Sequence, residues 1–274
     1  MTTAAAASSN PSLDYARGLA RAFGGAILFC LPLLMTMEMW ALGFEMDRFR
    51  LIVFILLGAP LIWGLSHFAG FRHTTCLRDD LLDASSGLAV GFIVSTALLA
   101  VFGVIAPGQP IDEVVGKVAL QAIPAAIGAV LARKQLVGGE SGDDADEESY
   151  PAELFLMAAG ALFVALNVAP TEEMKLISYQ MAPWQALLLV LGSSAILHAM
   201  VYSLGFRGQH SHDRPWQALL HFSVPGYAIV LTVALYLQWT FGHLDGHGLG
   251  QIVMTTVVIA LPGAVGAGAA RLLV

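Results

Sequence analysis

Eight apolar stretches, each long enough to cross a bilayer, decide what this sequence can fold into. As a helix, about 20 apolar residues span a hydrocarbon core of about 30 Å. The stretches are residues 17–42, 50–70, 84–105, 115–133, 152–175, 183–204, 216–241 and 249–271. Charged residues make up only 12% of the chain, about half of what a soluble domain carries. We therefore predict an all-α, polytopic helical membrane protein with eight transmembrane helices.

The distribution of basic residues predicts the orientation of these spans. An even number of spans puts both termini on one side, and cytoplasmic loops carry the excess of Lys and Arg. Nine of the 13 basic residues fall on the side of the termini and four on the opposite side. Both termini, including a disordered tail over residues 1–16, are therefore expected in the cytoplasm.

Charge and motifs exclude several classes of function. The net charge is −7, with no basic stripe, so nucleic-acid binding is not expected. The linker over residues 134–151 carries six acidic residues and is predicted to be a flexible cytoplasmic tether. The sequence has no phosphate-binding glycine loop, no Gly-x-Ser-x-Gly elbow and no zinc-protease motif. We expect a protein that is not an enzyme and that needs no cofactor.

An internal duplication is the most informative feature. When the chain is aligned with itself so that Thr36 falls on Thr171, Glu38 and Met39 fall on Glu173 and Met174. We call this alignment the first register. In a second register, with a slightly larger offset, the stretch 124–133 falls on 262–271, with six identities in ten that include proline, glycine and arginine. Apolar bias alone would not align these residue types.

The duplication predicts two parallel four-helix repeats, over residues 17–133 and 152–274. Because each repeat has an even number of spans, both enter the membrane the same way up, about a pseudo-two-fold axis along the membrane normal. A transport pathway is expected on or beside this axis. The small-xxx-small pairs Gly128–Ala132 and Gly266–Ala270 predict close helix packing.

Glu38 and Glu173, at matched repeat positions, are the main functional candidates. An ionisable side chain in the membrane is costly and usually faces a cavity or a partner. Both lie in a Thr-x-Glu-Met segment, so Thr36, Thr171 and carbonyls freed near Pro170 could add oxygen ligands. The alternative is that each carboxylate reaches the outer surface or caps a helix.

The repeats diverge beside these glutamates, where Glu172 and Lys175 occur only in the second repeat. If the two segments converge, three carboxylates and one ammonium share one site. Two close carboxylates do not both ionise easily, so one of them would have a raised pKa and could carry a proton. Alternatively, Lys175 forms a plain surface ion pair with Glu172.

Two histidine clusters offer weak candidates for a metal site. His210 and His212 lie in a predicted cytoplasmic loop, and His243 and His247 in a predicted outer loop. Neither cluster has a third strong ligand at a defined spacing.

The Thr-x-Glu-Met segments, together with the Pro-Ala-Ala-Ile-Gly-Ala-Val-Leu-Ala-Arg stretch at 124–133, resemble a bacterial family of integral membrane proteins of unknown function. The resemblance extends from about Asp14 to Arg271. It implies a multi-pass protein of the bacterial inner membrane. It implies no activity, cofactor or catalytic residue.

The residues therefore predict a cation channel or transporter, with a path lined by the repeat-related glutamates and with coupling to protons as one possibility. The expected partners are the lipid bilayer and a cation or proton. If two chains form a homodimer, four Thr-x-Glu-Met segments could surround one pore. Two alternatives stay open, a membrane-embedded metal-dependent enzyme that uses the histidines and a sensor or structural protein that transports nothing.

Overall fold

The computed structural model describes residues 11–68, 77–135, 150–204 and 219–273, and these residues form a bundle of helices. The first half of the chain contains α1 (Pro11–Leu34), α2 (Met37–Glu45), α3 (Arg48–Phe68), α4 (Leu77–Val101) and α5 (Ile111–Gln135). The second half contains α6 (Tyr150–Leu166), α7 (Glu172–Gln180), α8 (Pro183–Leu204), the π-helical turn η1 (Leu219–Ser223), α10 (Val224–Thr240) and α11 (Leu249–Leu273). Within the described residues, each half is thus a long helix, a short helix and three further helical segments, with η1 and the α10 that continues it counted as one.

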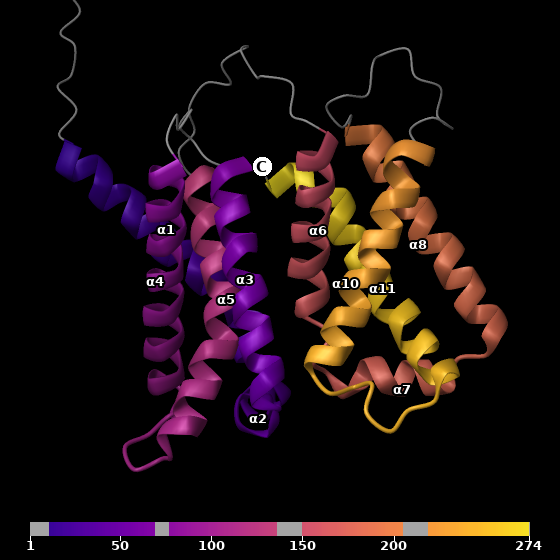
Figure 1. Ribbon diagram of the computed structural model, residues 1–274, viewed down its shortest axis with the longest axis horizontal. Coiled ribbons are helices and arrows are strands. Elements are labelled where there is room, and N and C mark those ends of the chain that lie inside the picture. Colours follow the sequence, from indigo (N-terminus) through magenta and orange to yellow (C-terminus); the bar gives the residue numbers. More distant parts are fainter. Residues whose placement is uncertain (1–10, 69–76, 136–149, 205–218, 274) are drawn as a thin grey trace, which may run out of the picture.

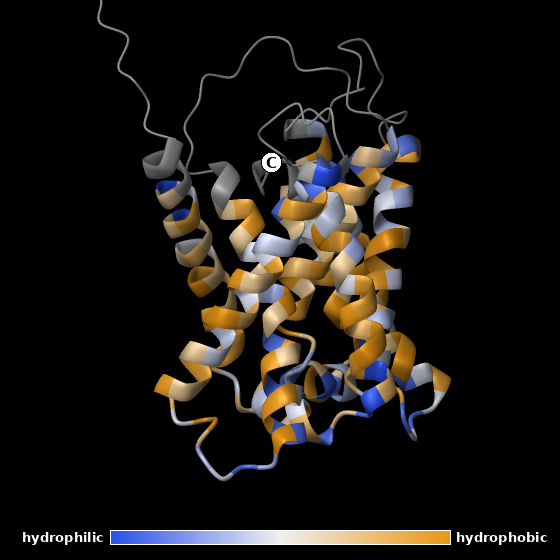
Figure 2. Ribbon diagram, turned by 60° about the vertical axis from the view of Figure 1, so that its left-hand side comes forward, coloured by the Kyte–Doolittle hydropathy of each residue, from blue (hydrophilic) through white to orange (hydrophobic). Residues whose placement is uncertain are grey.

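The described helices agree with the predicted membrane-spanning fold. Seven of them are long and apolar enough to cross a bilayer, and α6, with 17 residues, is a shorter apolar helix at the place of the fifth predicted span. Figure 2 shows apolar residues along the bodies of the helices and hydrophilic residues gathered toward the two ends of the bundle.

The first and fifth predicted spans extend too far, because each is broken near its end. α1 ends at Leu34 and α6 at Leu166, and the short helices α2 and α7 follow after a turn. Thr36 and Thr171 both have extended backbone angles, and each side-chain hydroxyl donates a 2.8 Å hydrogen bond to a carbonyl three residues earlier. This local bond gives the backbone an alternative to a continuous helix. α1 also begins at Pro11, inside the tail predicted as disordered.

Both halves run in the same direction through the bundle. In Figure 1, α1 and α6 begin at the same end, where α11 also ends, and α2 and α7 lie at the opposite end. We call these the terminal end and the short-helix end.

Equivalent glycines bring two helices together in each half. A Cβ on Gly25 of α1 would overlap the carbonyl oxygen of Gly128 on α5, and a Cβ on Gly266 of α11 would overlap that of Gly160 on α6. The first register places Gly25 on Gly160, and the second register places Gly128 on Gly266. The small residues therefore permit close helix packing, as predicted.

Where they meet in the bundle, the two halves pack through apolar side chains. The rings of Phe29 and Phe163 lie 4.5 Å apart, and one core cluster contains Leu33 and Ile62 from the first half with Leu162 from the second. At this place the interface between the halves is therefore apolar, and the pathway expected on or beside the pseudo-axis stays a prediction.

Candidate functional site

The Thr-x-Glu-Met segments lie at the short-helix end, where each begins a short helix. Glu38 lies in the first turn of α2 and is half-buried, whereas Glu172 and Glu173 lie in the first turn of α7 and are exposed. A carboxylate at this position is stabilised by the N-terminal end of the helix dipole. The repeat thus places equivalent acids in equivalent local structures with different exposure.

A hollow of about 490 Å³ opens beside α7 in the second half. It is lined by Glu172, Glu173, Lys175, Leu176, Tyr179 and His247. We call it the α7 hollow. Lys175 and Glu172 form an ion pair with 2.9 Å between Nζ and Oε1, and the side chain of Glu172 is 66% exposed. Four candidates from the second repeat or its outer loop therefore share one opening, and Glu38 does not line it.

A narrower recess adjoins the α7 hollow. It is lined by Lys175, Tyr179, His243, His247, Gln251, Ile252 and Thr255. We call it the His243 recess. Lys175, Tyr179 and His247 line both spaces, and the Tyr179 hydroxyl lies 3.1 Å from Nδ1 of His247. These three residues form a neck, and in this conformation the recess has no room for a water molecule.

His243 is the buried titratable residue of the recess. Only 7% of it is exposed, and its Nδ1 has no hydrogen-bond partner among the described residues. Burial lowers the pKa of His243 to about 4, the ammonium of Lys175 acts in the same direction, and the carboxylate of Glu172 opposes them. His243 is therefore neutral at pH 7, with a nitrogen available for a hydrogen bond or a proton.

The floor of the recess is a neutral network between α7 and α11. The amide Nε2 of Gln251 donates to the hydroxyl of Ser178 over 2.6 Å, and that hydroxyl lies 2.9 Å from the hydroxyl of Thr255. Ser178 and Thr255 are 2% and 3% exposed. These three side chains are already hydrogen-bonded to one another. His243, by contrast, has a ring nitrogen without a hydrogen-bond partner among the described residues.

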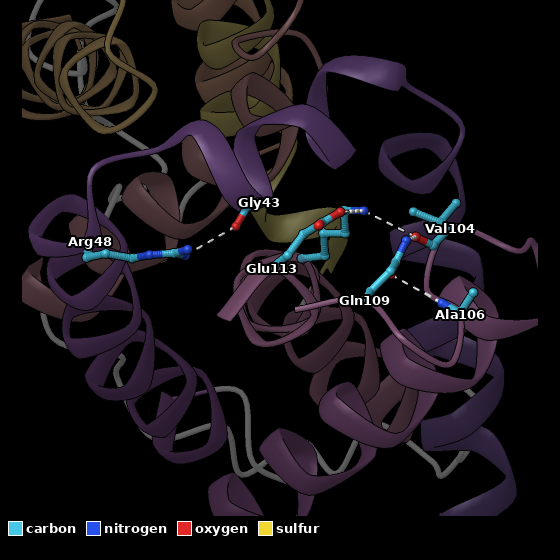
Figure 3. Close-up of polar contacts among 7 residues, drawn as sticks. Gly43, Arg48, Val104, Ala106, Gln109 and Glu113 are labelled. Atoms are coloured by element: carbon cyan, nitrogen blue, oxygen red, sulfur yellow. Dashed lines mark hydrogen bonds and ion pairs between the residues drawn. The ribbon is translucent and has the colours of Figure 1, made fainter. Parts of the chain in front are cut away.

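The first half carries a charged pair where the second half has this neutral network. The second register aligns Glu113 with Gln251 and Lys117 with Thr255. Lys117 is 6% exposed, and its ammonium contacts Glu113 Oε1 at 2.5 Å and the carbonyl of Val104 at 3.2 Å. Figure 3 shows this cluster, in which Gln109 also binds the backbone of Ala106.

Glycines close this end of the first half. A Cβ on Gly43 of α2 would lie 2.6 Å from the backbone of Lys117, and a Cβ on Gly116 would overlap the carbonyl oxygen of Gly43. In the first register, the residue equivalent to Gly43 is Ser178. The contact of α2 with α5 in the first half is therefore a tight glycine contact. The equivalent contact of α7 with α11 in the second half is a polar one.

The loop that carries His243 and His247 is attached to the first half. Both carboxylate oxygens of Asp245 accept hydrogen bonds of 2.8 Å from Arg50 of α3, whose guanidinium lies 5.6 Å from the centre of the Trp239 ring. These bonds lower the pKa of Asp245. Gly242 adopts a φ of +77° beside Arg50, a backbone angle that favours glycine. The pair fixes the loop above the recess.

The predicted histidine clusters differ in what the structure describes of them. His243 and His247 both line the recess, but no group of three His, Cys, Asp or Glu side chains in the described ranges could hold a metal ion. His210 and His212, like most of the acidic linker, lie outside the described residues.

Sequence reasoning did not single out two buried carboxylates at the terminal end. Asp80 is 2% exposed and lies 2.7 Å from Nδ1 of His67, and Glu153 in the first turn of α6 is fully buried. An acidic residue inside the predicted apolar span over 152–175 is a signal that could have identified Glu153.

The chain matches the family model described as "Putative integral membrane protein (DUF2391)" over residues 18–274. It therefore belongs to this family, in agreement with the resemblance noted in the sequence, and is a multi-pass integral membrane protein. No curated protein and no solved structure matches the chain.

Proposed function

We propose that this member of the DUF2391 family transports a cation, that the cation is the proton, and that the α7 hollow is its entrance. One observation carries the proposal. Two carboxylates, an ammonium and a histidine line an open hollow that adjoins a recess containing a buried histidine with an unpaired nitrogen. Buried or intramembrane ionisable groups commonly mark ion or proton pathways.

The chemistry of the lining residues favours protons over metal cations. A hard cation such as Ca²⁺ takes about six to eight oxygen ligands. In the recess, the hydroxyls of Ser178 and Thr255 already interact with the amide of Gln251. The groups that remain are the carboxyl of Glu173 and the imidazoles of His247 and His243, and carboxyl and imidazole groups are the ones that proton pathways use.

The charge distribution suggests that the short-helix end faces the outside of a bacterial inner membrane. The excess of basic residues lies on the side of the termini, and such residues favour the cytoplasm. Protons would then enter at α7 from outside. The narrow neck at Tyr179 and His247 implies a gated transporter rather than an open channel.

Ion flux into proteoliposomes that contain the purified chain tests this proposal. We expect proton uptake, reported by a pH-sensitive dye inside the vesicles, when a K⁺ diffusion potential is imposed. The double variant Glu172→Gln/Glu173→Gln should reduce uptake to the level of protein-free vesicles. Glu45→Gln, an exposed carboxylate of α2 that lines neither space, is the matched control.

Glu38→Gln tests the prediction that both repeats contribute to the pathway. Parallel assays with Na⁺, K⁺ and Ca²⁺ identify a different cargo. If a folded sample transports no ion, the proposal is wrong, and a sensor or a metal-dependent enzyme becomes the better reading.

A further inference from the structure

α10 carries buried polar side chains near both of its ends. Near the short-helix end, Gln238 is fully buried, and its Nε2 donates a 2.7 Å hydrogen bond to Thr256 of α11. Its Oε1 has no hydrogen-bond partner among the described residues. Gln238 also connects to the recess, because its backbone carbonyl accepts a hydrogen bond from the backbone N–H of His243.

A second polar group lies toward the terminal end, where α10 meets α8. The hydroxyl of Tyr227 is 2.8 Å from that of Ser193, and the hydroxyl of Ser223 is 2.8 Å from Nδ1 of His198. Ser193 and Ser223 are buried, and His198 is half-buried. We call these four residues the His198 site.

The two polar groups lie on one face of α10 with an apolar section between them. Positions 227, 234 and 238 follow α-helical spacing, and Ser223 is the last residue of η1, directly before α10. Val230 and Ala234 between them are fully buried, as are Ala260 and Ala264 of α11. The section from Tyr227 to Gln238 is about 16 Å long at the standard helical rise.

The backbone is irregular beside the His198 site. Residues 219–223 form a π-helical turn that ends at Ser223, and the hydroxyl of Tyr150 donates a 2.6 Å hydrogen bond to the carbonyl of His221 in this turn. Single π-helical turns are rare and occur frequently at functional sites.

The first half lacks most of these polar groups at the matched positions. The first register aligns Ser193 and His198 with Gly58 and Trp63. The second register aligns Tyr227 and Gln238 with Ala89 and Ala100. Ser223 aligns with Ser85, and the first half buries polar side chains of its own, Ser95 and Gln121. Tyr227, His198 and Gln238 therefore have no residue of the same kind at the matched positions of the first half.

From this arrangement we infer that the proton route runs along α10 within the second half, and that the His198 site releases protons at the terminal end. This inference rests on the proposed function. A proton that crosses the apolar section on water binds His198, whose Nδ1–H then donates to Ser223. The proton leaves to water at the terminal end, and the imidazole returns to its neutral form. The apolar section around Val230 is the barrier that must be hydrated for transport.

Proton uptake by variants in the same proteoliposomes tests the inference. His198→Gln should abolish uptake, because an amide side chain can still hydrogen-bond to Ser223 but cannot carry a proton. Tyr227→Phe should reduce it. Thr232→Val is the control, because this exposed hydroxyl of α10 donates to the carbonyl of Ala228 in its own helix.

A gain of flux provides a second readout that a purely structural role would not change. Val230→Thr keeps the shape of the side chain and adds a hydroxyl to the barrier, so uptake should rise. Val253→Thr, on an exposed position of α11, should leave it unchanged. If His198→Gln impairs folding, Val230→Thr still tests whether the proton route runs along α10.

The outcomes separate the two proposals. If the wild type transports protons, the double glutamine variant does not, and His198→Gln and Val230→Thr both behave as wild type, the inference about α10 is wrong while the proposed function stands. If the wild type transports no protons, the proposed function fails and the inference fails with it.

Discussion

The two halves of this protein share a scaffold but end differently beside their short helices. In the first half, the side chains of Lys117 and Glu113 are 7% and 25% exposed, and α2 packs tightly above them. In the second half, a different ion pair lies on α7. The side chains of its members, Lys175 and Glu172, are 22% and 66% exposed beside an open hollow. Among the described residues, the short-helix end is therefore tightly packed in the first half and has an open hollow in the second.

This difference shows which contacts the fold needs and which are free to change. The glycine contacts of α1 with α5 and of α6 with α11 occur in both halves, so they belong to the common scaffold. The charged and polar side chains at the short helices differ at matched positions, so the fold tolerates either set. A functional site fits best where the common scaffold leaves space and titratable groups.

The largest effect is expected from breaking the buried ion pair of the first half. Glu113→Gln leaves the ammonium of Lys117 buried without its carboxylate, which should cost about 3 kcal/mol of stability. Adding Lys117→Thr recreates the neutral pair of the second half and should recover most of this loss. Thermal unfolding in detergent measures both. A double variant no more stable than Glu113→Gln would show that the two ends are not interchangeable.

Substitution of the shared glycines should cost somewhat less stability, and the cost should be the same in both halves. Gly128→Ala and Gly266→Ala each force a methyl group against another helix, and overpacking of this kind costs about 1–3 kcal/mol. Gly192→Ala on α8, where a Cβ meets nothing within 4 Å, should be neutral or stabilising. Clearly unequal effects of the first two substitutions would contradict a common scaffold.

The pKa of His243 predicts a pH effect on stability in the second half. Because the folded pKa of about 4 lies below the ordinary value of 6.5, the unfolded chain binds the proton more readily. Stability should therefore fall as the pH falls below about 6.5, by about 1 kcal/mol at pH 5.5. His243→Gln should remove this contribution, which unfolding temperatures at pH 7.5 and pH 5.5 would reveal. An unchanged slope would mean that His243 is not buried as described.

The smallest effect is expected from the exposed pair that attaches the loop to the first half. Asp245→Asn weakens its hydrogen bonds to Arg50, so backbone amides of residues 241–248 should exchange with deuterium faster. Asp112→Asn, which breaks the exposed contact with Arg48 within the first half, is the matched control and should not affect that loop. Equal exchange in both variants would show that the pair of Arg50 and Asp245 does not hold this loop in place.

Much of the scaffold could be predicted from the sequence, because it depends on patterns that the sequence displays directly. Apolar length indicated the membrane-spanning helices, and matched glycines such as Gly128 and Gly266 indicated where helices approach. The breaks after Leu34 and Leu166 were missed, since the residues on both sides are apolar and the decisive hydroxyl bonds of Thr36 and Thr171 are local.

The site was only partly predictable, because side-chain burial depends on packing between distant segments. From the sequence, Glu173 and Glu38 were equivalent candidates, and nothing in it indicated that only Glu173 lines a hollow. His243 looked like a loop histidine, and its burial arises from contacts with α7 and α11, which lie far from it in the sequence or across a turn. Gln238 and Tyr227 looked like ordinary residues of an apolar helix.

Chemical blocking of equivalent positions in the two halves tests most directly whether the pathway enters through the second half. Tyr179 at the neck and Phe44 on α2 align with one another, and both are exposed. Each would be changed to Cys in a chain with Cys30 and Cys76 replaced by Ala, and proton uptake measured before and after a bulky thiol reagent is added. The reagent should stop proton uptake by Tyr179→Cys and should not affect uptake by Phe44→Cys. Equal inhibition of both variants, or inhibition of Phe44→Cys alone, would contradict it.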